Sequence, residues 1–570
     1  MSRERGDLRA SLLILCVCLL VYNANLRLIS AGDTYPARFL PFGIWGYGTL
    51  TLDPIAGTTA QGHPRPYWIA HARTGHAVSL YPVVLPVLIT PLYAPAVAYL
   101  QIRGWDEDRL DRLAQIMEKL IASLLASTGA ALMYLLLRRR ARPRDALLLT
   151  AAFAFGTTTW VISSQALWQH GLAELLLISA LLILTGPCTP SRALAAGFLC
   201  ALLAANRPPD ALLAVALGVY GLLWAGRRSA ALLAAGAVAP VAFVLIYNLG
   251  VTGALAGGYG VATVASPSFF QRGLLPGIAG LLFSPARGLF VFCPFLLFLP
   301  AFLPRAFRDS GNRRLDLFLT AGVVAQVLLY AKTDWRAGFS WGPRFLTDLL
   351  PILVWMLAPI LTSLRPPARL VFAAAVGLSI VIQAVGAFWY LGTSDLAIYA
   401  VRSGPGEMRA AWDLHNTPFL AELRHGPAPR GLGHRFKATP AQAAAGGPAL
   451  PPEIRGNLDR MAASRTPAVT VAAGDDVLLE GWALDGYSTP VAVLVAVDGR
   501  PSATTEVFFD RPDVRDRLRV ESPAGWRVRI PSQDLSPGEH EILASVRSRA
   551  GDSLYPLRSK KLIVLPGPAR

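Results

Sequence analysis

Long apolar segments recur along most of this 570-residue chain, and charged residues fall mainly in the short stretches between them. About 20 apolar residues in a helix cross the hydrocarbon layer, so this pattern predicts a polytopic α-helical membrane protein. A soluble α/β core also contains apolar runs, but they do not repeat this often with so few internal charges. We expect eleven spans, at residues 11–29, 118–137, 145–162, 170–186, 193–206, 210–225, 229–249, 287–304, 315–331, 348–363 and 369–390.

Basic residues decide how these spans are oriented. Arginine-rich loops stay in the cytoplasm, which places the basic N-terminal segment and the loop 138–144 on that side. An even number of crossings must separate the two, and the spans 11–29 and 118–137 supply two. We therefore expect an uncleaved first helix, a cytoplasmic N-terminus, and an extracytoplasmic C-terminus.

One apolar stretch, 79–100, would break this parity if it crossed the membrane. It contains Pro82, Pro86, Pro91 and Pro95. Each proline removes a backbone donor, and an unsupported backbone in lipid is costly. The stretch is predicted to be a juxtamembrane or re-entrant helical segment inside one long extracytoplasmic loop, residues 30–117.

The chain carries a formal net charge of +17, which would also suit nucleic-acid binding. Its arginines lie in loops between apolar segments, so we interpret the charge as a topology signal, with the lipid bilayer as partner and no nucleic acid. The five cysteines lie within or beside apolar segments and give no disulfide framework. His63, His71 and His76 lack zinc-ligand spacing, so no metal or cofactor is expected.

Beyond residue 390 the hydrophobicity falls and the pattern changes. Residues 391–467 read as a linker region, with an amphipathic patch at Ala411–Leu423 that partly packs on the membrane domain, residues 1–390. From 468 to 570 apolar positions alternate with a period of two between turn signals, which predicts a small extracytoplasmic β-sandwich. The sandwich either binds a glycan or a partner, or only caps the membrane domain.

Polar residues gather near the expected outer ends of the spans. A carboxylate there can deprotonate an acceptor hydroxyl, and guanidinium groups can hold a phosphate and stabilise it as a leaving group. We take Asp33 as the candidate general base. The candidate substrate-binding residues are Arg38, Asp53, His170, Glu174, Arg207, Lys332, Arg336 and Arg344.

Structural roles are the alternatives for several of these residues. Asp33 has the sequence context of a helix cap, and Asp53, before Pro54, that of a turn residue. His170 and Glu174 are four residues apart on one helix face, as are Arg344 and Asp348, so each pair could bond internally. A carboxyl group such as Glu174 inside an apolar helix is expensive unless it is paired or functional.

Several segments, in their order along the chain, resemble the GT-C superfamily of integral-membrane glycosyltransferases. They are Gly32–Pro41, Ser164–Gly171 and Ser340–Leu346, together with the proline-rich helix after Tyr81-Pro82 and a span that ends in Arg-Arg. The resemblance covers roughly residues 8–390. It extends to the protein O-mannosyltransferases and the aminoarabinose transferases of lipid A, and most closely to a bacterial branch.

The resemblance implies inverting transfer of a sugar from a polyprenyl-phosphate donor to an extracytoplasmic glycan, lipid or protein, at a bacterial plasma membrane. It also implies that the first-loop acid, Asp33, is the catalytic base. Other members have adjacent acids in that loop, whereas here Thr34 follows Asp33 and the nearest second acid is Asp53. A transporter or flippase of a lipid-linked glycan is the alternative function, although the chain shows no convincing half-to-half repeat.

Overall fold

The computed structural model describes residues 2–56, 67–105, 107–262, 270–309, 311–399, 407–428 and, with short gaps, 454–565. His63 and part of the expected linker, mainly residues 400–406 and 429–453, lie outside the described residues. The chain forms two compact units. The described residues of the first, within 2–55, 67–398 and 407–428, are mainly helical, and those of the second within 454–565 form mainly strands.

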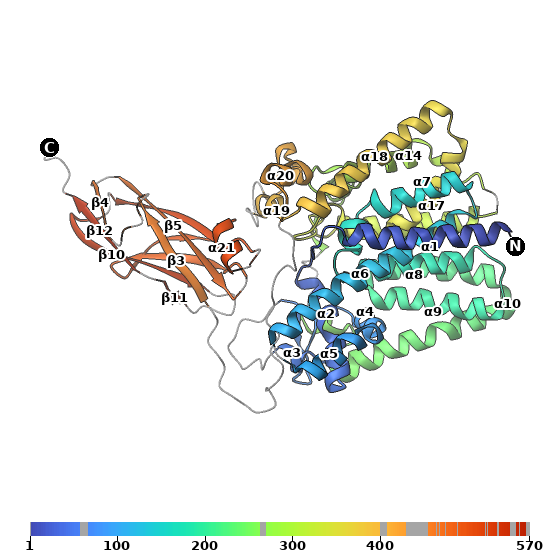
Figure 1. The fold of residues 1–570 in the computed structure, drawn as a ribbon, viewed down its shortest axis with the longest axis horizontal. Coiled ribbons are helices and arrows are strands. Elements are labelled where there is room, and N and C mark those ends of the chain that lie inside the picture. Colours follow the sequence, from blue (N-terminus) through green and yellow to red (C-terminus); the bar gives the residue numbers. More distant parts are fainter. Residues whose placement is uncertain are drawn as a thin grey trace. The chain divides into compact units, whose positions relative to one another are not determined.

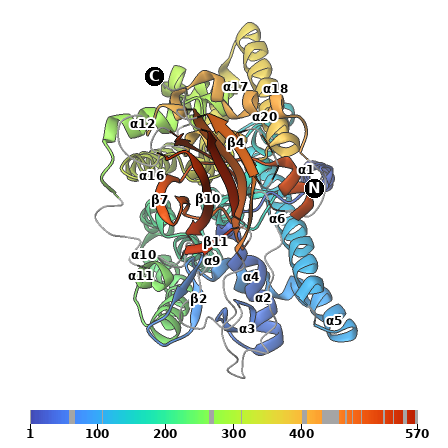
Figure 2. The same cartoon turned by 90° about the vertical axis from the view of Figure 1, so that its left-hand side faces the viewer.

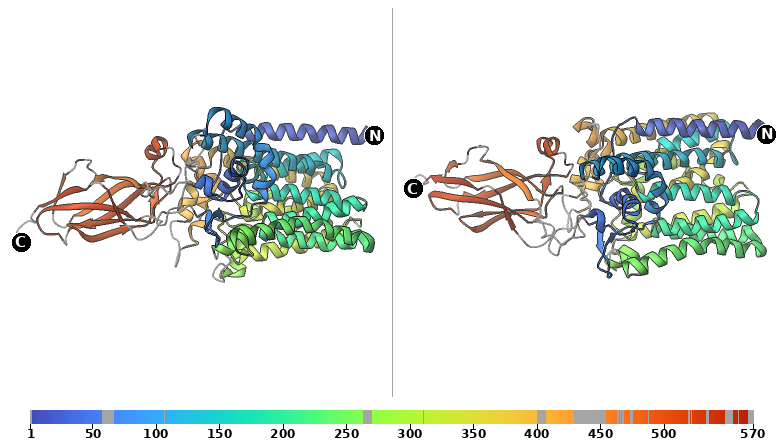
Figure 3. Two further views of the ribbon diagram at one scale, coloured as in Figure 1. Left: turned by 90° about the horizontal axis from the view of Figure 1, so that it is seen from below. Right: turned by 60° about the horizontal axis from the view of Figure 1, so that its bottom comes forward.

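Long helices lie side by side in the first unit (Figures 1 and 3). Helices α7, α9 and α18 each begin with a proline, whose fixed φ suits the first helical position and whose missing N–H is not needed there. Helix α10 is two helices joined at Gly226, whose φ of 64° reverses the chain. The bounds are α1 Ser2–Asn23, α6 Glu107–Leu137, α7 Pro143–Phe155, α8 Gln169–Leu184, α9 Pro190–Asn206, α10 Ala211–Tyr247, α16 Arg313–Ala331, α17 Leu350–Ser363 and α18 Pro366–Trp389.

Eight helices among the described residues are long and apolar enough to cross a membrane, by length and composition. The chain is thus a multi-pass membrane protein, but the count differs from the eleven expected spans. Seven of those spans meet the criterion, and the eighth helix is the stretch Val84–Arg103. The expected spans 170–186 and 193–206 form shorter helices of 16 and 17 residues, α8 and α9.

Two further expected spans are not continuous helices. Residues 145–162 form α7 only as far as Phe155, and a wide π-type turn, η3 (Thr159–Ser163), follows. The segment 287–304 is broken into α13 (Leu289–Phe292), η7 (Pro294–Leu297), α14 (Phe298–Ala301) and α15 (Leu303–Ala306). Prolines at 294, 300 and 304 remove the donors that a continuous helix would need.

The loops expected in the cytoplasm meet at one end of the helical unit, where the N-terminus also lies (Figure 1). Arg138 bonds Asp7 of α1 at 2.7 Å, and Arg140 bonds Asp316 of α16 at 2.8 Å. Arg369, at the start of α18, pairs with Asp145 of α7. The parity argument requires this grouping, and the structure provides it.

The segment between α1 and α6 forms short elements at the opposite end. Helix α2 follows η1 directly, and α4, η2 and α5 pack against α2 around the prolines of the stretch 79–100. Figure 2 shows this group beside β2 and α11 (Gly257–Val261). The bounds are η1 Gly32–Thr34, α2 Tyr35–Tyr47, α3 Asp53–Ala56, β1 Ile69–His71, β2 Ala77–Ser79, α4 Val84–Ile89, η2 Thr90–Tyr93 and α5 Ala94–Arg103.

Three further parts complete the first unit. Helix α12 (Leu274–Phe283) packs against α16, and η8 (Arg344–Leu349) leads into α17. The region expected as a linker begins with α19 (Thr393–Ile398), which packs on α20 (Pro418–His425), and α20 packs on α18. The first part of that region therefore contains helices of the first unit.

The second unit contains two β-sheets with a shared apolar core, as the alternation predicted. One sheet has the order β4-β12-β10-β6-β7 with β11 beside β10, and the other has β3-β5-β9-β8. Ile542, Ala544 and Val546 of β10 point into the core around Trp526. The bounds are β3 Ile454–Met461, β4 Ala468–Ala472, β5 Asp476–Asp485, β6 Ala492–Val497, β7 Arg500–Thr505, β8 Phe508–Phe509, α21 Pro512–Leu518, β9 Gly525–Pro531, β10 Gly538–Arg547, β11 Leu554–Pro556 and β12 Lys560–Leu565.

The sheets begin earlier than residue 468, where the alternating pattern was expected to start. Strand β3 pairs antiparallel with β5, with a register shift between Leu458 and Arg460. Its charged residues and this irregularity hide the two-residue period that marks the other strands.

Candidate active site

The carboxylate of Asp33 accepts hydrogen bonds from three side chains far away in the sequence. Nη1 of Arg344 donates to Oδ2 at 2.7 Å, and the Tyr67 hydroxyl donates to Oδ1 at 2.5 Å. The Tyr81 hydroxyl also hydrogen-bonds this carboxylate. Asp33 lies in the turn η1, and the helix that follows receives no side-chain cap from its N-cap residue Thr34. Asp33 therefore bonds a group of polar side chains rather than capping α2.

The surroundings keep Asp33 ionised at neutral pH. Burial raises the pKa of its carboxyl group, but Arg344 and the two tyrosine hydroxyls outweigh burial and leave the pKa below its ordinary 3.8. The side chain is nevertheless 20% exposed, so a substrate can reach it. Glycine at position 32 leaves room for this contact, because a Cβ there would lie 2.7 Å from the Tyr67 oxygen and would displace that ring.

Aromatic rings lie close to the guanidinium group of Arg344. Its guanidinium carbon lies 4.5 Å from the ring centre of Trp168 and 5.6 Å from that of Phe345. Its Nε is buried and has no hydrogen-bond partner among the described residues. The guanidinium thus has one ion pair and unused donor capacity.

A second charged cluster lies close by, at the ends of α8, α9 and α17. His170 Nδ1 lies 2.8 Å from Asp348 Oδ1, and the other oxygen of Asp348 bonds Arg207. Arg207 also pairs with Asp210 at 3.3 Å, and Gln326 donates to Asp210 at 2.7 Å. All of these side chains are almost fully buried.

These partners exclude two of the alternatives raised by the sequence. His170 does not bond Glu174, whose carboxyl group accepts from Thr159 at 2.6 Å. Arg344 does not pair with Asp348, because Arg344 bonds Asp33 and Asp348 bonds His170 and Arg207. A spacing of four residues on a helix allows such pairs, but His170 and Arg344 bond residues that are distant in the sequence instead.

Tyrosines connect the two clusters into one site. Tyr259 interacts electrostatically with Asp33, Arg344 and Arg207, and its ring lies edge-on to Tyr81 with centres 5.8 Å apart. The Tyr330 ring stacks on Phe345 at 4.6 Å, beside Arg344, while Arg207 lies 5.5 Å from the same Tyr330 ring. Two arginines and three carboxylates therefore surround the same group of rings.

Other expected site residues lie outside this group. Arg38 forms a fully buried ion pair with Glu118, so its charge is already balanced. Asp53 accepts from His76 Nδ1 and from the backbone N–H of Ala77, both at 2.7 Å, which braces the β1–β2 hairpin. This contact fits the alternative turn role of Asp53 better than contact with a substrate. Lys332 joins neither cluster in the part of the chain that the structure describes.

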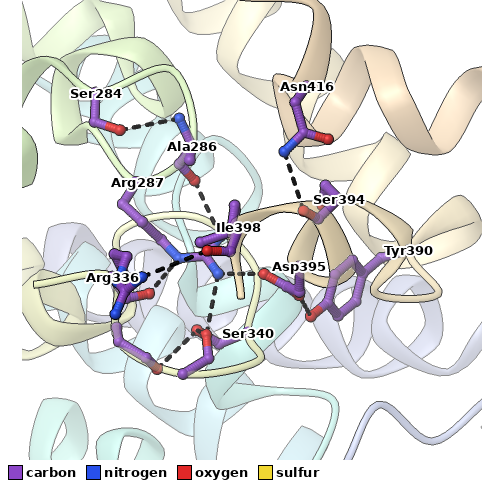
Figure 4. A network of polar contacts seen from close by, with 12 residues as sticks. Ser284, Ala286, Arg287, Arg336, Ser340, Tyr390, Ser394, Asp395, Ile398 and Asn416 are labelled. Carbon is purple, nitrogen blue, oxygen red and sulfur yellow. Dashed lines mark hydrogen bonds and ion pairs between the residues drawn. The ribbon is translucent and has the colours of Figure 1, made fainter. Parts of the chain in front are cut away.

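Arg336 belongs to a network that holds the loop before Arg344 (Figure 4). Its guanidinium pairs with Asp334 at 2.7 Å and with Glu407 at 2.6 Å. Arg287 bonds the carboxylate of Asp395 and donates to two carbonyl oxygens of the loop, those of Arg336 at 2.6 Å and Gly338 at 3.0 Å. These contacts make Arg336 a brace of the loop rather than a free ligand for a phosphate.

Sequence reasoning missed several members of the site. Tyr67 lies in a loop with no recognisable pattern, and only the fold brings it to Asp33. Asp210 was visible three residues after Arg207, next to two prolines at a span boundary, and could have been included on that ground. Among the described residues, no group of three His, Cys, Asp or Glu side chains is arranged to hold a metal ion.

No protein-family model matches the chain, and no curated protein matches it. Among solved structures it is similar to the archaeal oligosaccharyltransferase AglB from Archaeoglobus fulgidus, determined in complex with an inhibitory peptide and a dolichol-phosphate. The TM-score is 0.37 and the sequence identity 12%, over 72% of this chain and 60% of the archaeal protein. The chain thus spans less than two thirds of that protein, and a likeness this small assigns neither a family nor an activity.

Proposed function

We propose that this chain is a membrane glycosyltransferase that moves a sugar from a polyprenyl-phosphate donor to an extracytoplasmic glycan, lipid or protein. The observation that carries the proposal is the Asp33 carboxylate. It is ionised, partly exposed and bonded to Arg344, at the end of the helical unit opposite the basic loops. The GT-C resemblance of the segments around Asp33, Trp168 and Arg344 supports the same function.

Asp33 serves as the general base in the proposed reaction. It takes the proton of an acceptor hydroxyl while that oxygen attacks the anomeric carbon of the donor sugar. The new glycosidic bond forms as the bond between the anomeric carbon and the phosphate oxygen breaks. Attack on the face opposite the leaving group inverts the configuration, and polyprenyl phosphate leaves with the bonding electrons.

Arg344 balances the charge that develops during this step. The donor phosphodiester carries one negative charge, and a second develops on the leaving oxygen. Arg344 lies beside the base, and its guanidinium can donate to the phosphate in competition with Asp33. The charge of Arg207 is already balanced by Asp348 and Asp210, so its part is to hold the Tyr330 ring, whose centre lies 5.5 Å away, in the site.

The proposal is tested by replacing the base. The variant Asp33→Asn should lower the rate of sugar transfer by about 10²–10⁴-fold, because it removes the proton acceptor but keeps the side-chain shape. Purified protein is assayed with a panel of polyprenyl-phosphate sugars, by mass spectrometry of the products. Asp53→Asn is the matched control, an acid of the same region that braces a hairpin, and its rate should stay within a few-fold of the original.

Two results would contradict the proposal. Full transfer activity in Asp33→Asn would exclude this residue as the base. If an intact lipid-linked glycan crosses the membrane of vesicles containing the protein, and no sugar is transferred from any donor, the result would instead favour a transporter or flippase.

A further inference from the structure

An open cavity of about 620 Å³ lies between the turn after α6 and the end of α17. These segments lie at the end of the helical unit where the basic loops meet, opposite α2 (Figure 1). Four of its seven lining residues are arginines: Arg138, Arg139, Arg140 and Arg142. The remaining three, Ala141, Pro143 and Thr362, carry no charge. The lining contains basic groups and no acidic group, which favours an anion as the ligand.

Two of the four arginines have their charge balanced within the protein. Arg138 pairs with Asp7 at 2.7 Å, and Arg140 pairs with Asp309 at 3.1 Å and Asp316 at 2.8 Å. These ion pairs tie together α1, α16 and the turn after α6. Arg138 and Arg140 are thus fixed in the lining of the cavity. The charges that an anion could bind there are those of the other two arginines.

Arg139 and Arg142 have no carboxylate within ion-pair distance among the described residues. Arg139 donates to the carbonyl oxygen of Leu182 at 2.5 Å and to the Thr185 hydroxyl, while Arg192 donates to the same carbonyl at 3.1 Å. Burial and the neighbouring charge of Arg192 both lower the pKa of Arg139. Arg142 is exposed at the start of α7. An anion here would relieve the repulsion between like charges.

The cavity also lies at the depth of lipid headgroups. Two helices that can span a membrane end beside it, one at Leu137 and the other at Ser363. Pro143 lines the cavity, and Leu147, four residues later on the same face of α7, is 52% exposed. A cationic pocket with an exposed apolar side chain next to it, toward the middle of the helix, matches an amphiphile rather than a free ion.

We propose that this cavity binds an anionic phospholipid, with Arg139 and Arg142 holding the phosphate and Leu147 contacting an acyl chain. Guanidinium groups suit the phosphodiester because they donate two parallel hydrogen bonds to its oxygens. The site is independent of the proposed glycosyl transfer, because it lies at the other end of the helices. Its failure would not affect the role of Asp33.

The test measures binding of a fluorescent phosphatidylglycerol to the full-length protein in phosphatidylcholine nanodiscs. The double variant Arg139→Gln/Arg142→Gln should bind it about 25-fold more weakly, since each arginine at an anionic surface contributes roughly fivefold. The matched control Arg227→Gln/Arg313→Gln removes two exposed arginines from the same end but outside the cavity, and it should bind nearly as well as the original protein. Retention on size-exclusion chromatography and the helical circular dichroism signal check the fold.

Further variants and competitors separate a built site from general charge. Arg139→Lys/Arg142→Lys keeps the charge but loses the paired donors, so its affinity for the lipid should lie between those of the original protein and the glutamine variant. If the glutamine variant misfolds, the lysine variant replaces it in the comparison. An equal loss of lipid affinity in the cavity variant and the control variant would show that the lipid is attracted only by the general surface charge, and would overturn the proposal. Displacement of the lipid by inorganic phosphate at the same concentration would overturn it too, because the cavity would then select a free ion.

Discussion

The Asp33 carboxylate is bonded to Arg344, and this contact lowers the basicity of Asp33 and the phosphate affinity of Arg344. A carboxylate held by a guanidinium is a weaker base, and a guanidinium held by a carboxylate binds phosphate less well. The donor phosphate would compete with Asp33 for Arg344. If donor binding draws Arg344 away, Asp33 keeps only its tyrosine partners and becomes a stronger base at the moment when it is needed.

This competition predicts that Asp33→Asn binds polyprenyl phosphate more tightly although it does not turn over. An ion pair of this partly buried kind contributes about 1 kcal/mol, so the dissociation constant should fall roughly fivefold. Arg344→Gln should raise it by about tenfold or more, because a charge-assisted bond to phosphate is lost. Isothermal titration calorimetry in detergent measures both. Weaker binding in Asp33→Asn would show that the carboxylate does not compete with the phosphate.

The sequence was sufficient to select Asp33, Arg207 and Arg344 as candidates, because charged residues at the ends of apolar helices stand out. It could not assign their partners. The ion pair between Asp33 and Arg344 joins residues 311 positions apart, and local spacing instead favoured Arg344 with Asp348. Arg38 looked equally available in the sequence, but its partner Glu118 lies on α6, 80 residues away.

Among the elements, the loop from α16 to η8 depends on contacts from outside itself. Ala337, Gly338 and Gly342 all have positive φ, which is unfavourable for alanine in particular. Arg287 holds two carbonyl groups of this loop and is itself fixed by Asp395, and both side chains of the pair are about 1% exposed or less. The backbone leading to Arg344 is therefore positioned by a buried ion pair.

Removing one partner of this pair should loosen the loop. Asp395→Asn or Arg287→Leu alone should destabilise the protein by about 3–5 kcal/mol, because a buried charge is left uncompensated. Amide hydrogen exchange at residues 336–343 should increase in each single variant. The double variant Arg287→Leu/Asp395→Asn should be less destabilised than the sum of the two, and Asp413→Asn, at a half-exposed acid on the same segment, serves as control. If the losses of stability in the two single variants add up to that of the double variant, the two residues act independently.

Element boundaries were predictable only where one property dominated. Hydrophobicity located the long helices, and arginine counting correctly grouped the N-terminus with the loop 138–144. Hydrophobicity gave the wrong result at 287–304, where the segment is apolar enough for a span but contains prolines that divide it into short helices. It also failed at β3, whose polar residues and irregular pairing carry no two-residue period.

At the scale of the whole molecule, each of the two units has its own means of stability. The strands of the second unit enclose an apolar core that includes Trp526, Ile542 and Val495, all fully buried. A unit with its own core folds without the rest of the chain. The helical unit instead uses buried ion pairs such as Arg140 with Asp316 at the ends of its helices.

The segment 433–570 expressed alone should therefore fold cooperatively, with the same thermal midpoint that its strands show in the full chain. Circular dichroism at wavelengths dominated by β-structure follows the transition. Trp526→Ala should lower the free energy of unfolding by about 3–5 kcal/mol, because it leaves a cavity in the apolar core that the two sheets share. Val507→Ala is the control, since that side chain is 56% exposed and contributes little. A segment that stays unfolded until the helical unit is present would show that the strands depend on the membrane domain for their stability, and the division into two independent units would then be wrong.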